Sequence, residues 1–127
     1  MRPFVANIML INAALFVFGA VQHAGVRIAS FHEPRIIPAA IVESICALSL
    51  VLGAGAMLTR QTRAWVIAVV GNVVALSGVV LGIVALALGA GPRTASNDLY
   101  HRVMLVLVAI ALFSLFLRRR RAGFQRS

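Results

Sequence analysis

The chain has little of what a soluble domain normally contains. Its 127 residues include no lysine, only three acidic residues and a single cysteine, and 12% of the residues are charged. An average soluble domain is about a quarter charged. So small a charged fraction excludes a soluble enzyme domain and a disordered chain. The single cysteine excludes a disulfide framework within the chain.

Most of the sequence consists of long apolar runs. Hydrophobic side chains make up 61% of the residues, and the mean hydropathy is +0.99. One crossing of the hydrocarbon core of a bilayer needs about 20 mainly apolar residues, which leaves room for four crossings and little else. We therefore predict an all-α integral membrane protein, a single domain over residues 1–127 that forms an antiparallel bundle of four transmembrane helices.

Turn signals separate the four apolar runs. Pro34 and Pro38 stand at the entrance to the second run, residues 89–92 end the third, and Ser96 or Asn97 is a candidate N-cap for the fourth. The predicted helices cover residues 4–23, 36–58, 64–89 and 99–117, and a basic tail follows over residues 118–127. Because the connections are short, neighbouring helices should be antiparallel.

The arginines predict the orientation. With the N-terminus in the cytoplasm, eight of the twelve basic residues lie inside: Arg2, Arg60, Arg63, Arg118, Arg119, Arg120, Arg121 and Arg126. The positive-inside rule thus favours both termini in the cytoplasm of a multi-pass protein. The net charge of +9 then reflects orientation, not a nucleic-acid partner. The run Arg118, Arg119, Arg120 and Arg121 is expected to attract anionic lipids, and a composition rich in Ala, Gly and Val without lysine points to a bacterial inner membrane.

Glu43 is the one acidic residue inside a predicted span. An ionisable side chain there is costly and is by default a functional-site hypothesis. His23, His101 and Arg102 are expected at a similar depth, whereas Asn12 and Asn72 lie deeper. We expect these six residues to form a ligand site below a set of loop residues: Arg27, His32, Glu33, Arg35 and Asp98.

Several interpretations of this polar group stay open. An outward-facing pocket could take a polar headgroup or a redox ring such as a quinone, with Glu43 and a histidine handling protons. A structural pair between Glu43 and either Arg102 or a histidine would instead lock the bundle. A divalent metal held by His23, Glu43 and His101, or a haem held by two histidines, are further alternatives, although no HxxxH, ExxH or CxxCH motif supports them.

Small residues recur along the third predicted helix in steps of three and four: Ala64, Ala68, Gly71, Ala75, Gly78, Gly82, Ala85 and Gly89. Such a seam allows close helix packing in a membrane. It predicts either a contact within the bundle or a homodimer face through Gly71, Gly78 and Gly82. Trp65 and Tyr100 are expected to be aromatic anchors at the two interfaces, and Cys46 an inert buried thiol.

The stretch from Ala39 to about Leu76 contains Glu43, a Leu-rich run that ends at Gly53, and the turn Leu58-Thr59-Arg60 before a further apolar helix. It resembles the second helix of DoxX-like small four-helix membrane proteins. Only Glu43, Gly53 and Arg60 carry over, and the first helix departs from the family pattern at residues 22–25. The resemblance implies a compact bundle with an accessory role in membrane redox complexes, some linked to quinone and sulfur-compound oxidation.

The sequence thus predicts a ligand-binding or accessory subunit, linked to quinones or lipids and part of a larger membrane complex. A dimeric transporter or channel, a structural or assembly protein, and an enzyme that uses Glu43 and a histidine as acid and base remain alternatives. No catalytic residue can be assigned from the sequence.

Overall fold

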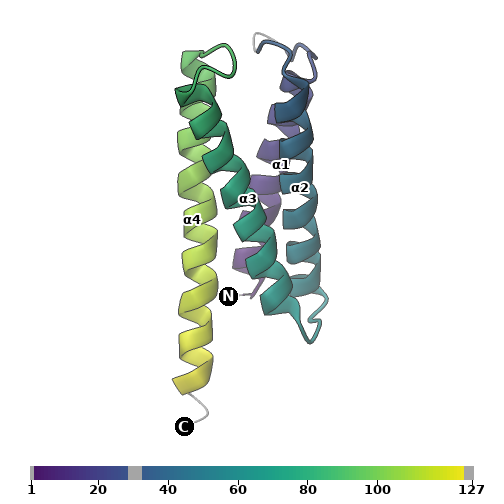
Figure 1. Ribbon diagram of the computed structural model, residues 1–127. Helices are drawn as coiled ribbons and strands as arrows, with labels where there is room; N and C mark the ends of the chain where they lie inside the picture. The colour runs from purple at the N-terminus through teal and green to yellow at the C-terminus, as the bar shows by residue number, and fades with distance from the viewer. Residues whose placement is uncertain (1, 29–32, 125–127) are drawn as a thin grey trace.

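The computed structural model describes residues 2–28 and 33–124, apart from the side chains of Arg2 and residues 118–124. This part of the chain contains four α-helices, α1 (Arg2–His23), α2 (Ile37–Leu58), α3 (Ala64–Ala87) and α4 (Ala95–Phe124) (Figure 1). Each has the length and the apolar composition needed to cross a membrane. The predicted all-α class with four candidate spans is therefore confirmed.

The predicted helix limits agree to within two residues for α1, α2 and α3. The predicted start of the fourth helix is wrong, because α4 begins at Ala95, four residues before the predicted position. Thr94 caps this helix: its Oγ1 accepts a hydrogen bond from the backbone N–H of Asn97 at 3.1 Å. Ser96 and Asn97 are therefore not the N-cap, although Asp98 does lie in the first turn as expected. At its other end α4 continues through residues 118–124, so the basic segment there extends the helix.

Each of the first three helices is followed, two positions after its last residue, by a residue in the left-handed backbone conformation. These residues are Gly25 (φ +95°), Arg60 (φ +56°) and Gly89 (φ +73°). After α3, the N–H of Ala90 donates to the carbonyl of Ala85 at 2.9 Å, which is the long bond of a Schellman motif. Glycine suits this conformation because it has no Cβ, so Arg60 is the unusual member of the three.

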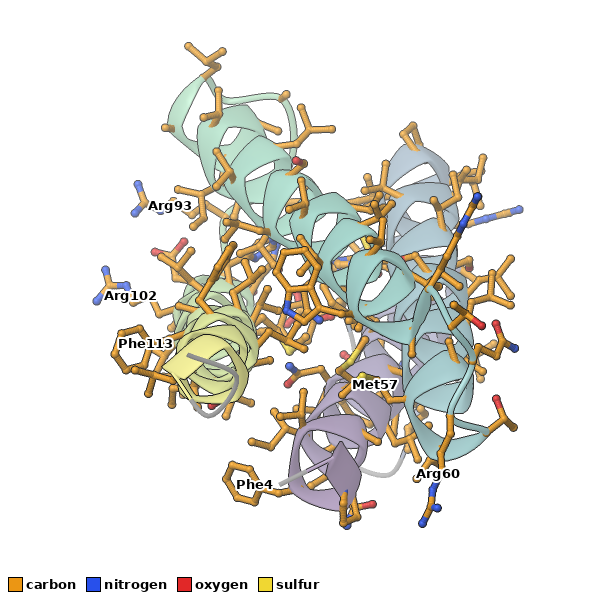
Figure 2. The ribbon with its side chains drawn as sticks, turned by 90° about the horizontal axis from the view of Figure 1, so that it is seen from below. Phe4, Met57, Arg60, Arg93, Arg102 and Phe113 are labelled. Atoms are coloured by element: carbon orange, nitrogen blue, oxygen red, sulfur yellow. The ribbon has the colours of Figure 1, made fainter. Side chains whose placement is uncertain are left out.

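The helices form a closed ring in which α1 packs on α2, α2 on α3, α3 on α4 and α4 on α1. Successive helices run in opposite directions, and α3 lies obliquely across the others (Figure 1). The fully buried core includes Val5, Met9, Leu50, Met57, Met104 and Leu115. In Figure 2 Phe4 and Phe113 point away from the bundle, and both are exposed. Large apolar side chains on the outer surface are what a lipid-facing bundle requires.

The small-residue seam of α3 faces neighbours within the same chain. Gly71 lies against the backbone of Ser49 on α2, Gly78 against the thiol of Cys46, and Gly82 against the ring of His101 on α4. Ala64, Ala68 and Ala75 are buried along the same line. The contact within the bundle is thus formed, and a homodimer through these glycines stays a prediction.

Candidate functional site

His23 and Glu43 form a buried pair between α1 and α2. The His23 Nδ1 lies 2.8 Å from the Glu43 Oε2, and both side chains are at least nine-tenths buried. His23 is the last residue of α1, and its carbonyl accepts a 2.8 Å hydrogen bond from the N–H of Ile36 just before α2. This backbone bond ties the two helix ends together and fixes the pair in register. The expected partnership of Glu43 with a histidine is present.

Tyr100 brings a third polar group from α4 to this pair. A Cβ built on Gly19 would lie 2.6 Å from both the Glu43 Oε1 and the Tyr100 hydroxyl, so these two oxygens lie side by side over Gly19. The hydroxyl also lies 3.4 Å from the Leu15 carbonyl, to which it donates. Gly19 therefore makes the space in which Glu43 and Tyr100 meet. Tyr100 is half-buried and points inward, so its interpretation as an interfacial anchor was wrong.

His101 lies in the first turns of α4, and its ring packs against α3 at Gly82. Its Nδ1 lies 2.9 Å from the carbonyl of Asn97, and since a carbonyl can only accept, Nδ1 carries the proton. The Nε2 of the neutral ring then bears a lone pair. This nitrogen is turned toward Gly82 on α3, where a Cβ would collide with the ring.

Glu43 and His101 both line a cavity between α2 and α3. We call it the α2/α3 cavity; its volume is about 390 Å³, within the range of about 300–1,000 Å³ that is usual for small-molecule sites. Its remaining lining is apolar and mostly small: Ile36, Pro38, Ala39, Val42, Gly78, Leu81, Gly82, Ala85 and Ala90. The small side chains of α3 leave space for the cavity, and Glu43 and His101 are its two titratable groups.

A second cavity lies on the other side of the pair, between α1 and α4. This α1/α4 cavity has a volume of about 230 Å³ and includes Gln22, His23, Asn97 and Tyr100 in its lining. A smaller hollow of about 70 Å³, the bridging cavity, touches His23, Asn97 and His101. The His23–Glu43 pair thus stands between two cavities, because His23 lines one and Glu43 the other.

Glu33 closes the outer end of the α1/α4 cavity. Its carboxylate accepts hydrogen bonds from the hydroxyls of Thr94, at 2.8 Å, and Ser96. Glu33 is buried, and these bonds attach the loop before α2 to the first turn of α4. Of the other loop residues, Asp98 pairs with Arg93 at 2.9 Å, Arg27 and Arg35 are exposed, and His32 lies outside the described residues.

Arg102 does not belong to the site. It is exposed, and in Figure 2 it points away from the bundle beside Arg93. With Arg93, Asp98 and His101 it borders a hollow of about 130 Å³ between α3 and α4, which Glu43 does not line. Charged guanidinium groups near a helix end extend toward water rather than into the bundle. The predicted pairing of Arg102 with Glu43 is therefore wrong.

Asn12 and Asn72 also lie away from the cavities, although both are fully buried. Asn12 shares the inner face of α1 with His23 but is about 16 Å further along the helix axis. The Asn72 Nδ2 donates a 2.8 Å hydrogen bond to the carbonyl of Ala68, one turn back along α3. Neither side chain lines any of the three cavities, so the structure does not bring these two residues together with Glu43.

The metal and haem alternatives find no support in this geometry. Within residues 2–28 and 33–124, no three His, Cys, Asp or Glu side chains come together as a metal site would require. The two described histidines share only the bridging cavity, and its volume of about 70 Å³ is too small for a porphyrin ring.

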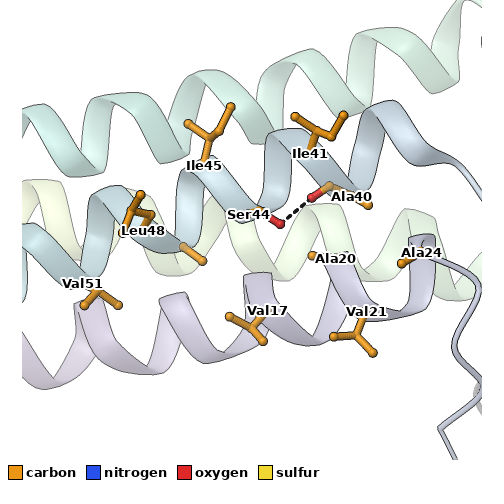
Figure 3. Close-up of a pocket in the computed structure, with 11 residues that line it drawn as sticks. Val17, Ala20, Val21, Ala24, Ala40, Ile41, Ser44, Ile45, Leu48 and Val51 are labelled. Atoms are coloured by element: carbon orange, nitrogen blue, oxygen red, sulfur yellow. Dashed lines mark hydrogen bonds between the residues drawn. The ribbon is translucent and has the colours of Figure 1, made fainter.

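A shallow groove runs along the outside of α1 and α2 (Figure 3). Its volume is about 700 Å³, and apart from Ser44 its lining is apolar, with Val17, Ala20, Ile41 and Leu48 among its residues. The Ser44 hydroxyl donates to the carbonyl of Ala40 on its own helix at 2.7 Å. The groove contains none of the candidate site residues, so it is separate from the site.

Four residues of the site were missed in the sequence: Gly19, Gln22, Gly82 and Tyr100. Gly82 was recognised only as part of the packing seam, and Gly19 was assigned no role in the site. Their role depends on a side chain from another helix, which no spacing within one helix reveals. A signal for Tyr100 did exist, because it immediately precedes His101 on a helix already assigned to the site.

Comparisons with protein-family models, curated proteins and solved structures found no match to the chain. The resemblance to DoxX-like proteins accordingly stays a prediction.

Proposed function

We propose that this chain is a ligand-binding or accessory subunit of a membrane redox system, and that its ligand is a hydroxyl-bearing ring compound of the quinol type held in the α2/α3 cavity. The observation that carries the proposal is that Glu43 and His101 both line an otherwise apolar cavity of about 390 Å³. A few well-placed polar groups in an apolar cavity are typical of small-molecule sites.

The polar groups of the cavity favour a ligand that donates hydrogen bonds. The Glu43 carboxylate accepts them, and so does the His101 Nε2 when the ring is neutral, because Nδ1 then donates its proton to the Asn97 carbonyl. A quinol offers hydroxyl donors on an apolar ring, whereas the oxidised quinone offers only acceptors. The reduced form is therefore the one we propose to bind.

The cavity lies at the end of the bundle where α1 ends and α4 begins. With eight of the twelve arginines at the other end and in the two termini, we propose that this end faces outward and that both termini are cytoplasmic, as in a bacterial inner-membrane protein. The resemblance of residues 39–76 to DoxX-like proteins supports a role beside a quinone-linked complex.

A structural role is the second candidate, because the buried His23–Glu43 pair would by itself hold α1 to α2. This role requires no ligand, so the two candidates differ in a measurable way. A dimeric transporter or channel, and an enzyme using Glu43 as acid or base, have no such observation in their favour.

Mass spectrometry of lipid-soluble molecules that co-purify with the protein tests the proposal. We expect a quinone or quinol in amounts stoichiometric with the wild-type protein and a loss of most of it in Glu43→Gln and His101→Leu. Equal amounts in the wild-type protein and both variants, or no ring compound in a correctly folded wild-type preparation, would favour the structural role.

A further inference from the structure

The α1/α4 cavity contains buried polar nitrogens that have no protein partner. Within the described residues, neither the His23 Nε2 nor the Gln22 Nε2 has a hydrogen-bond partner, and both side chains are more than nine-tenths buried. Leaving such groups without a partner costs about 1–3 kcal/mol each. Both residues line this cavity, and His23 also lines the bridging cavity, so a molecule in the α1/α4 cavity is adjacent to both residues.

Water fits the cavity better than a second organic ligand does. Its volume of about 230 Å³ is below the range of about 300–1,000 Å³ usual for ligand sites, but holds several water molecules. A buried water needs two to four polar partners. Gln22, His23 and Glu33, which all line the cavity, can supply them.

We infer that the α1/α4 cavity is a water-filled vestibule and that the His23–Glu43 pair carries protons from it to the ligand cavity. A hydronium ion in the vestibule donates a proton to the His23 Nε2 and becomes water, and the proton on Nδ1 passes over the 2.8 Å contact to the Glu43 carboxylate, which becomes the neutral acid. One proton enters and one leaves the ring, which ends neutral with its proton on Nε2. The reverse sequence returns the proton to water.

The path continues no further than Glu43, which lines the α2/α3 cavity and lies beside the Tyr100 hydroxyl. The inference rests on the proposed function only for the last partner of the proton, which is a ligand hydroxyl in the α2/α3 cavity. The exchange between vestibule water and Glu43 requires no ligand and can be measured on the protein alone.

Exchange of the His23 ring proton with deuterated water, followed by NMR on protein labelled with ¹⁵N-histidine, tests the relay. The His23 signal is identified by its absence in His23→Gln. In Gln22→Met, which keeps the side-chain length but removes the polar anchor, we expect exchange to slow about tenfold, equivalent to one lost water hydrogen bond. Leu15→Phe, which fills the apolar floor of the vestibule and alters no polar group, should slow it as well.

The matched control is Val42→Leu, which reduces the α2/α3 cavity at a residue that lines neither cavity beside His23, and it should leave the exchange rate at the wild-type value. Unchanged exchange in both vestibule variants would overturn the relay, and so would slowing by Val42→Leu alone, because water would then enter from the ligand side. Quinol binding is measured separately. If exchange slows in the vestibule variants as expected but the protein binds no quinol, the proposed function is contradicted and the relay is still supported.

Discussion

Glu43 and His23 determine the chemistry of this molecule at the residue scale. A carboxyl group inside a span needs a partner, and the partner is an imidazole 2.8 Å away rather than the guanidinium of Arg102. The sequence could identify Glu43 because it is the only acidic residue within a run of apolar ones. It could not identify the partner, because three cationic or titratable groups lay at a similar predicted depth.

Glu43 and His23 should contribute to the free energy of unfolding as a coupled pair. Glu43→Ala leaves His23 buried without its partner and should lower the free energy of unfolding by about 3 kcal/mol, since breaking a buried pair costs more than removing it. Glu43→Ala combined with His23→Ala should cost less than the sum of the two single changes. Unfolding in mixed micelles, measured for all four proteins of the cycle, checks this; additive effects would mean that the two side chains do not interact.

Gly19 should be required for the position of Glu43. A methyl group there would lie 2.6 Å from both the Glu43 Oε1 and the Tyr100 hydroxyl, so Gly19→Ala must push the two side chains apart. We expect Gly19→Ala to weaken quinol binding about tenfold, the equivalent of one hydrogen bond to a charged group. Equilibrium dialysis with duroquinol measures the effect, and Ala14→Gly, on an exposed position of α1, serves as the control.

At the scale of the helices, α3 decides how closely the bundle packs. Its small residues bring it against α2 at Gly71 and Gly78 and against α4 at Gly82. Small side chains in the second half of α3 also leave the α2/α3 cavity open. The three- and four-residue spacing predicted the seam correctly, but the spacing alone does not say which part of a seam is filled and which part lines a cavity.

Gly71→Ala should destabilise the bundle by about 1–3 kcal/mol, because its methyl group would meet the backbone of Ser49 and not a movable side chain. Gly55→Ala is the matched control, since a methyl group there meets no atom within 4 Å. On helix propensity alone the control should be neutral or more stable by up to about 1 kcal/mol. Thermal unfolding in detergent compares the two, and equal destabilisation would contradict this packing.

The helix ends show where sequence patterns succeed and where they fail. Gly25 and Gly89 mark ends because their residue type suits a left-handed backbone, whereas Arg60 adopts the same conformation without a signal in its side chain. The start of α4 was placed too late because Thr94 was not considered as the cap. Composition gives the number of spans reliably, and individual capping bonds then decide their limits.

At the scale of the whole molecule, the two ends of the bundle differ. The cavities and the His23–Glu43 pair lie toward the end where residues 24–28, 33–36 and 88–94 connect the helices. Hydropathy predicted the four helices, but the cavities depend on how the helices cross, which no single-helix pattern contains. Arg118–Arg121 lie outside the described side chains, so their contact with anionic lipids remains a prediction.

The orientation can be tested with single cysteines in a Cys46→Ser background. Pro92 and Gln61 are both exposed and lie in loops at opposite ends of the bundle. In intact cells, a membrane-impermeant maleimide should label Pro92→Cys and leave Gln61→Cys unlabelled until the cells are opened. The reverse pattern would place the cavities on the cytoplasmic side.

The most direct test of the central claim is a binding titration with duroquinol on the purified protein and two neighbouring variants. Ala39→Leu fills the α2/α3 cavity, whereas Ala40→Leu adds the same atoms on the α1/α2 groove. We predict saturable binding to the wild-type protein and to Ala40→Leu, and loss of binding in Ala39→Leu. Equal binding by all three proteins, or by none, would contradict a ligand site between α2 and α3.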